Sequence, residues 1–368
     1  MATQRMLKIL ARSLIATAVC ACSSIGPPTV ERDRIDYGSA IADSWKQQTL
    51  LNIVKLRYGD FPVFLEIAQV IAGYQVETTV GAGFNAASNS GAIADLLTFG
   101  GSAAAQGKYT DRPTLIYAPL TGNDFLKKLM TPIPPSAVLF MLQSGYSADL
   151  VMRIAVNSIN GVGNESRRGM NRTIDPDFAR LVQLLREAQL ADAVQIRIER
   201  AKGSDSESAI LVFPHREDAQ LEAARAEIGS ILHLKPGVRE LDVYYGGYSG
   251  KNDEIAMMTR SMLQIMLELG AIVQVPEADV ASGRAAPGAV AVQAPGTPAT
   301  QAPALLNLLS GDSPPRDAYV AIQYGDHWFW IANTDIRSKY TFGMVMLLFS
   351  ISDTGVHGNA PVVTVPAN

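Results

Sequence analysis

Histidine and cysteine are the side chains that most often hold metal ions in proteins, and both are scarce in this chain. It has 4 His and 2 Cys among 368 residues. His215, His233, His327 and His357 have no second histidine three to five residues away and no cysteine nearby. Metal sites usually show such close spacing in the sequence. We therefore expect no metal ion and no other cofactor.

Serine and glycine motifs of enzymes also match only in part. Segments 145–149 and 247–251 each begin as a hydrolase nucleophile motif does but lack its final glycine. Segment 244–252 resembles a phosphate-binding loop, yet Tyr245 replaces its first glycine and Asn252 replaces the Ser or Thr that would bind magnesium. We interpret it as a glycine-rich turn from a strand to a helix, and we expect a protein that is not an enzyme.

The amino terminus has the pattern of a secretory signal peptide. Arg5, Lys8 and Arg12 occur without an acidic residue, and the apolar stretch 14–19 and small residues follow. This stretch is well below the roughly 20 residues that a permanent membrane span needs. We therefore expect residues 1–21 to be a cleaved signal peptide.

The cleavage region resembles the lipobox of bacterial lipoprotein precursors. Cys22 follows Ala21 and has Val19 three residues before it, which matches the small residue and the aliphatic residue of that motif. Cys20 fits less well because Val19 precedes it directly. The resemblance implies lipidation at Cys22 with palmitate-type acyl chains. Ser23 after the acceptor implies sorting to the outer membrane, with the body facing the periplasm.

Composition agrees with an anchored, folded envelope protein. Both cysteines lie in the signal region, so the mature chain has no thiol to form an internal disulfide. The net charge is -4, and the pI near 5.7 argues against a nucleic-acid partner, which would require an excess of Lys and Arg. Removal of the signal also removes three positive charges. Membrane attachment is therefore expected through the acyl chains.

Alternation over 74–84 predicts a long two-faced strand, because every second residue is apolar or small while the others are mainly polar. A Gly/Ala-rich stretch follows, and an extended Tyr- and Thr-rich pattern resumes near 107. We predict a long β-hairpin over 70–118 that inserts in a membrane or an assembly. The residues that mark it are Tyr74, Val76, Val80, Phe84, Tyr109 and Tyr117.

The remaining patterns predict an α+β fold, with a mixed, mostly antiparallel sheet, helices on one face and the long hairpin as an excursion. A helix is expected over 44–57, a buried strand over 151–158, a basic loop over 166–172, a helix over 253–269 and a strand over 271–275. The expected divisions after the signal peptide are a lipid-anchored tether 22–36, an N-terminal α/β region 37–165, an α+β region 166–280, an Ala/Pro-rich disordered loop 281–316 and a C-terminal hairpin, helix and strand 317–368 that completes the preceding domain.

Trp328 and Trp330 share one face of a predicted strand, and Phe329 points to the other face. Paired tryptophans can stack on sugar rings. The alternative is an ordinary hydrophobic sheet face, because Asp326 and Asn333 are the only acid and amide close by.

These patterns favour a non-enzymatic outer-membrane lipoprotein that acts as a structural or assembly component and contacts other envelope proteins or polymers. Segments 113–117 and 328–331 resemble Gram-negative envelope lipoproteins, a resemblance that implies no activity. One alternative is a homo-oligomeric export channel with one hairpin per protomer, similar in outline to the curli-secretion lipoprotein. Another is a periplasmic glycan-binding lipoprotein that uses Trp328 and Trp330.

Overall fold

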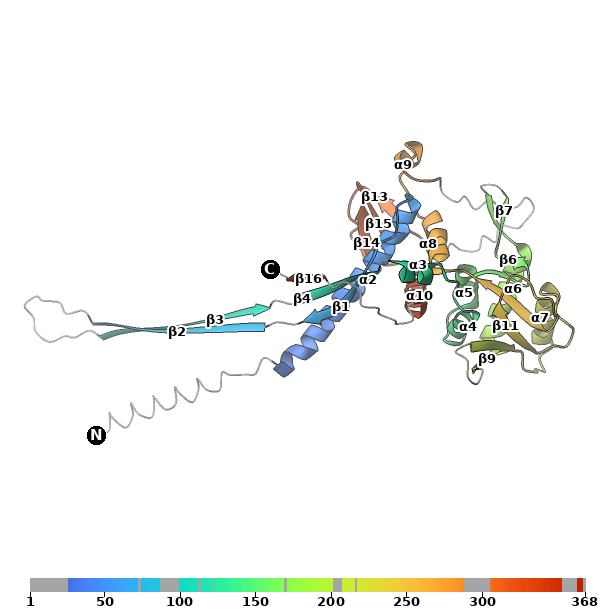
Figure 1. Ribbon diagram of the computed structural model, residues 1–368, viewed down its shortest axis with the longest axis horizontal. Helices are drawn as coiled ribbons and strands as arrows, with labels where there is room; N and C mark the ends of the chain where they lie inside the picture. The colour runs from blue at the N-terminus through green and yellow to red at the C-terminus, as the bar shows by residue number, and fades with distance from the viewer. Residues whose placement is uncertain are drawn as a thin grey trace, which may run out of the picture. The chain divides into compact units, whose positions relative to one another are not determined.

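The computed structural model describes residues 26–71, 74–86, 99–111, 114–120, 122–168, 171–200, 207–215, 217–287, 305–352 and 363–366. These residues form an α+β fold in which most strand pairs are antiparallel (Figure 1). The predicted fold class is therefore confirmed. The described chain divides into two units, one formed by 26–59, 269–287 and 305–346 and the other by the remaining residues.

The first unit combines a long helix with a small sheet. Helix α2 (Gly26–Arg57) packs on a three-stranded antiparallel sheet whose order is β13-β15-β14. The other elements of this unit are the short helix α9 and the first part of helix α10. The bounds are β13 (Leu309–Gly311), β14 (Ala318–Tyr324), β15 (His327–Ala332), α9 (Glu277–Ala281) and α10 (Ile336–Ser352).

The core of this unit follows from the alternation of its strands. Four apolar side chains are fully buried in it, namely Phe329 and Ile331 of β15 and Leu50 and Ile53 of α2. Gly270 allows a close approach to α2, because a Cβ there would lie 3.2 Å from the carbonyl oxygen of Ile53. Burial of these apolar side chains is the main stabilising contribution to the unit.

The second unit contains a six-stranded sheet with the order β6-β5-β12-β11-β10-β9. Every pair is antiparallel except β11 and β12, which are parallel. The strands are β5 (Val156–Ile159), β6 (Val162–Gly163), β9 (Gln195–Arg200), β10 (Glu207–Val212), β11 (Glu240–Tyr245) and β12 (Glu254–Thr259).

Helices cover one face of this sheet. Side chains of four helices and of the strands line a common interior, as the pocket between them shows. The helices of the unit are α3 (Asn123–Met130), α4 (Pro135–Gln143), α5 (Ala148–Ala155), α6 (Pro176–Leu190), α7 (Ala219–Ile231) and α8 (Met262–Ala271), whose last three residues belong to the first unit. Leu211, Val243 and Ile255 of three neighbouring strands are buried towards this interior.

Asn160 and Gly161 form the turn that joins β5 to β6. Their φ angles are 47° and 86°, and Ile159 pairs with Val162 on either side. An Asn-Gly pair is the preferred sequence for such a two-residue hairpin turn, because both positions require positive φ. The side chain of Asn160 then bonds to the carbonyl oxygens of Leu232 and Glu254 and accepts from the backbone N–H of Ala256.

The second unit also contains the predicted hairpin and two small sheets. Strands β2 (Tyr74–Ala86) and β3 (Phe99–Asp111) pair antiparallel along their whole length and are visible in Figure 1 as two long arrows. A three-stranded sheet has the order β1-β4-β16, and β7 pairs with β8. The bounds are β1 (Phe64–Ile71), β4 (Thr114–Leu120), β16 (Val363–Pro366), β7 (Glu165–Arg168) and β8 (Asn171–Ile174).

Several predicted elements are wrong in type. Residues 151–155 continue helix α5, so only the end of the predicted strand 151–158 is a strand. The predicted helix 253–269 is split between strand β12 and helix α8, and 271–275 contain no strand. The basic loop 166–172 contributes to strands β7 and β8.

The predicted divisions also need correction at three places. The tether 22–36 is helical from Gly26 onward. The loop 281–316 is ordered over 305–316, where Leu306 and Leu308 are buried and β13 joins the sheet. The hairpin β14–β15 groups with α2 rather than with the six-stranded sheet before it. Among the described helices, none has the length and apolar composition needed to cross a membrane.

Candidate functional site

The predicted lipidation residue, Cys22, lies outside the described residues, and helix α2 begins four residues after it. At about 1.5 Å per residue, 32 residues of helix extend about 48 Å. Side chains over 31–44 are mostly exposed, whereas those over 49–54 are mostly buried in the first unit. Helix α2 is therefore a stalk that is solvated at its start and embedded at its end.

A polar cluster fixes the embedded end of this stalk. Tyr58, directly after α2, donates a hydrogen bond of 2.6 Å to Oδ2 of Asp279 in α9. Arg284 donates to Oδ1 of the same carboxylate at 2.8 Å. His327 at the start of β15 lies with Nε2 3.8 Å from Asp279 and with Nδ1 2.8 Å from Asp312. One buried carboxylate thus connects three parts of the first unit.

The electrostatics of this cluster indicate a structural carboxylate. The hydroxyl of Tyr58 holds the pKa of Asp279 below its usual value, burial opposes this effect, and Arg284 adds to it. Burial and the Asp279 carboxylate raise the pKa of Tyr58 above its usual value. A carboxylate with a lowered pKa and satisfied oxygens is a poor general base. Asp279 therefore anchors α2 rather than moving a proton.

No local pattern in the sequence predicts this cluster, because its residues are scattered along the chain. Tyr58 and Asp279 are separated by 221 positions, and His327 is further along the chain. Their residue types are ordinary for exposed turns, and no local spacing connects them. Within the described residues, no group of three or more His, Cys, Asp or Glu side chains could hold a metal ion.

The hairpin residues identified in the sequence lie along one continuous ladder. Tyr74 pairs with Asp111, Val76 with Tyr109, Val80 with Ala105 and Phe84 with Gly101. Tyr117 lies beyond that segment, in β4 between Ile67 of β1 and Val363 of β16.

The neighbouring sheet has the same strand register as this ladder. Ile71 pairs with Thr114 and Tyr74 pairs with Asp111, so two residues on each strand separate these pairs and the register does not change. Among the described residues, β2 and β3 pair only with each other, and each strand therefore has one open edge over 13 residues. Open edges of this length can pair with a strand of another molecule.

Trp328 and Trp330 lie on the predicted shared face of β15 and are half-buried, while Phe329 on the other face is fully buried. Trp330 pairs with Leu309 and Ala321 in the two neighbouring strands. Its ring lies against Gly311, where a Cβ would be 3.2 Å from Cη2. The indole rings are therefore partly packed on their own sheet.

The glycine-rich segment 244–252 connects two strands, so the predicted turn from a strand to a helix is wrong. Residues 246–253 carry the chain from β11 to the parallel strand β12 in eight residues, whereas such crossovers usually take a dozen or more. A Cβ at Gly247 would lie 2.9 Å from Cε of Met258. The crossover therefore packs closely on β12 at Gly247, and a larger residue there would require the flexible Met258 side chain to move.

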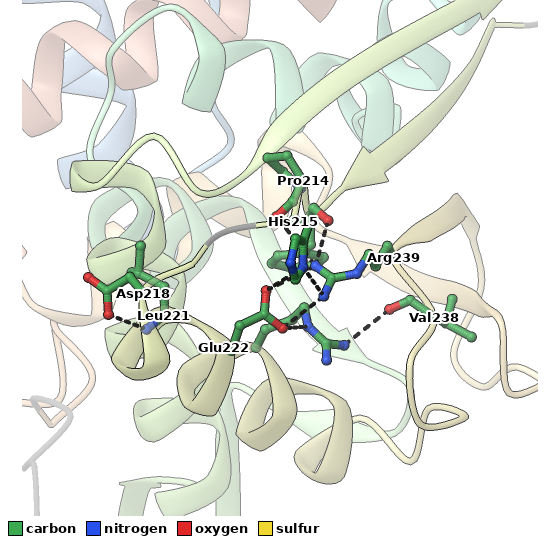
Figure 2. Close-up of polar contacts among 9 residues, drawn as sticks. Pro214, His215, Asp218, Leu221, Glu222, Val238 and Arg239 are labelled. Atoms are coloured by element: carbon green, nitrogen blue, oxygen red, sulfur yellow. Dashed lines mark hydrogen bonds and ion pairs between the residues drawn. The ribbon is translucent and has the colours of Figure 1, made fainter.

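A second polar cluster joins the N-terminal half of helix α7 to the segments before and after it (Figure 2). Glu222 accepts from Nη1 and Nη2 of Arg239 at 3.0 and 2.9 Å and from Nε of Arg225 at 3.1 Å. Arg239 also donates to the carbonyl oxygens of Phe213 and Pro214. His215 lies 3.1 Å from Arg239. These bonds connect the segments before and after α7, which is a structural role.

No known protein-family model matches the chain, and neither a curated protein nor a solved structure matches it.

Proposed function

We propose that this protein is a non-enzymatic outer-membrane lipoprotein that acts as a structural or assembly component of a cell-envelope complex. Acyl chains on Cys22 would attach it to the membrane, and helix α2 would hold the first unit away from the surface. The lipobox-like sequence and the start of α2 directly after it support this arrangement. A single acyl chain binds reversibly, so stable attachment needs the two or three chains of a lipoprotein.

The open edges of β2 and β3 carry the assembly role. An isolated two-stranded hairpin is at best marginally stable in water. Here 13 residue pairs form such a hairpin, and no third strand joins it among the described residues. Unpaired N–H and C=O groups along an edge strongly favour addition of another strand. A strand from a second copy or from another envelope protein would complete the sheet.

Because the strand pairs β1–β4 and β2–β3 share one register, the assembly role of the hairpin can be tested by shortening it. Replacing residues 78–107 by Asn-Gly would connect Glu77 to Lys108, which are paired in the ladder, through a two-residue turn. Strands β1 and β4 would keep their pairing. The matched control replaces residues 289–302 by an equal length of Gly and Ser, which leaves the hairpin sequence intact.

Both variants and the parent would be crosslinked in intact membranes, and their partners would be isolated by affinity purification. We expect the parent and the control to yield the same crosslinked species and the shortened variant to lose them. Equal crosslinking of the shortened variant would disprove the assembly role of the hairpin. Robust turnover of envelope substrates by the parent would disprove the non-enzymatic role.

Strand length favours one second function, an oligomeric export channel in which each protomer contributes its hairpin to a ring in the membrane. A membrane-crossing strand needs about 9–11 residues, and β2 and β3 have 13 each. This function predicts a ring that requires detergent for extraction. A Cys22→Ala chain that stays monomeric and stable in plain buffer would exclude it.

A further inference from the structure

The six-stranded sheet and its helices enclose a cavity of about 330 Å³ in the second unit. Its walls come from helices α4 to α7 and from strands β5 and β9 to β12. Buried apolar side chains such as Leu139, Met152, Leu211, Ile228 and Val243 form most of the lining. The cavity therefore lies inside the hydrophobic core, where close packing is the rule.

The size of this cavity is unusual for a protein core. Cores contain few voids larger than a water molecule, and the cost of a cavity grows with its volume. A cavity of about 150 Å³ lined by similar side chains stays dry and binds benzene. The volume here is about twice as large and reaches the lower end of small-molecule sites. Scaled from benzene, which has six carbon atoms, an apolar ligand of roughly ten to thirteen carbon atoms would fill it.

Four polar side chains line the cavity, and the three exposed ones mark its mouth. Gln143, Asp192 and Gln195 line it and are exposed. Gln189 also lines it, but its amide oxygen accepts from the N–H of Ala148 and its amide nitrogen donates to the carbonyl oxygens of Leu142 and Tyr146. The interior is therefore apolar, and the mouth offers amides and one carboxylate.

The positions of the apolar and polar lining residues indicate the shape and charge of a ligand that would fit the cavity. An apolar interior with a polar mouth fits a chain that is hydrophobic along its length and polar at one end. Among the described lining residues there is no Lys, Arg or His to pair with an anionic head, and Asp192 would repel one. Arg186 is near, but its Nη1 donates to Gln189 at 2.7 Å and it does not line the cavity.

We infer that the second unit binds the hydrocarbon tail of a lipid with an uncharged head, with the tail in this cavity and the head at Gln143, Asp192 and Gln195. This site is separate from the acyl chains on Cys22, because it lies in the folded core. It does not depend on the assembly role of the hairpin, so the two proposals fail separately.

The test uses the full chain with Cys22→Ala, prepared without detergent, and isothermal titration calorimetry with 1-decanol. We expect saturable binding with a stoichiometry of one, and weaker binding of 1-hexanol and of decanoate. Absence of decanol binding would overturn the inference. Tighter binding of decanoate than of decanol would overturn the uncharged head.

Variants identify the cavity as the site. Val243→Phe would place a ring in the cavity and should weaken decanol binding at least tenfold. Leu190→Ala, at a side chain that is 69% exposed and outside the lining, should change it less than twofold. Circular dichroism would establish that Val243→Phe folds. If it does not, Leu211→Ala enlarges the cavity and should improve 1-dodecanol binding relative to 1-decanol at least threefold; an unchanged ratio would contradict the site.

Discussion

The hydroxyl of Tyr58 lies 2.6 Å from Oδ2 of Asp279, so the end of helix α2 is hydrogen bonded to helix α9. Tyr58 also packs against Tyr324, with ring centroids 5.0 Å apart, and its ring meets that of Phe329 edge-on. Asp279 is 3% exposed. This contact is the point at which the stalk is fixed to the sheet of the first unit.

Tyr58→Phe keeps the ring and removes the hydroxyl, so it should destabilise the protein mainly through Asp279. A hydrogen bond to a charged group contributes about 1.5–3 kcal/mol, and we expect a loss of that order at pH 7. Because the pair lowers the pKa of Asp279 in the folded state, its contribution is complete above the unfolded pKa of about 3.9 and is lost as pH falls through the folded pKa.

Urea unfolding at pH 7 and at pH 3 would measure this difference. The gap between Tyr58→Phe and the parent should shrink at the lower pH. Tyr340→Phe, at a side chain that is 64% exposed, is the matched control and should change the free energy of unfolding by less than about 0.5 kcal/mol. A gap of equal size at both pH values would show that Asp279 is not the group responsible.

Asn160→Ala should be one of the most destabilising single changes in the second unit. It would remove three hydrogen bonds from a residue that is 7% exposed and would leave alanine at a φ of 47°. We expect a loss of roughly 3 kcal/mol or more. Asn157→Ala, at an exposed position in β5, serves as the control for thermal unfolding. Similar melting temperatures for both variants would contradict this role of Asn160.

Cys22→Ala should abolish acylation and release the protein from membranes, because no other attachment is expected. Metabolic labelling with a fatty acid and membrane fractionation would measure both effects. Cys20→Ala should remain labelled and membrane-bound. If Cys22→Ala still sediments with membranes, the proposed anchor is wrong.

The glycan-binding alternative predicts that Trp330→Ala reduces retention on an envelope glycan resin. Stacking of a sugar on an indole face would be lost, while Phe329 would still fill the core on the opposite face of β15. Trp45→Ala, at a half-buried residue of α2, tests for a general effect of losing a tryptophan. Retention that is the same with and without Trp330 would exclude this function.

Alternation allowed the hairpin and the last strands to be predicted from the sequence. The pairing of β2 with β3 and of β14 with β15 appears in the structure. Alternation of apolar and polar residues along the sequence identifies a strand wherever one face of the sheet is apolar and the other is polar. Helix α2 was predicted only from 44 onward, because its exposed first half has no apolar stripe, and proline is tolerated in the first turn of a helix.

The errors around 253–269 have a physical cause in the apolar residues on both sides of the short polar stretch 259–261. A run such as 255–269 has no clear period, so a strand and a helix cannot be separated by pattern alone. The signal that marks the boundary is a capping box. The hydroxyl of Ser261 accepts from the N–H of Gln264, and the amide oxygen of Gln264 accepts from the N–H of Ser261.

The candidate sites that were missed depend on distant residues. Tyr58, Asp279 and His327 meet only through the packing of α2 on its sheet, and the cavity exists only between folded layers. The sequence specifies these side chains, but it does not show how far apart they lie in the folded protein. The parallel pair β11 and β12 was missed because β12 (Glu254–Thr259) lies inside the segment that was predicted as a helix.

Helix α2 is fixed to the first unit at its C-terminal end. A change in the length of its solvated half therefore changes both the distance of that unit from the start of the helix and its orientation about the helix axis. Each residue inserted in the solvated half of α2, over 31–44, would raise the first unit by about 1.5 Å and turn it by about 100° about the helix axis. Seven inserted residues, close to two full turns, would raise it by about 10 Å while nearly restoring its original orientation. If the Cys22 anchor is correct, the number of residues in α2 determines which side of the first unit is presented to a neighbour on the same membrane.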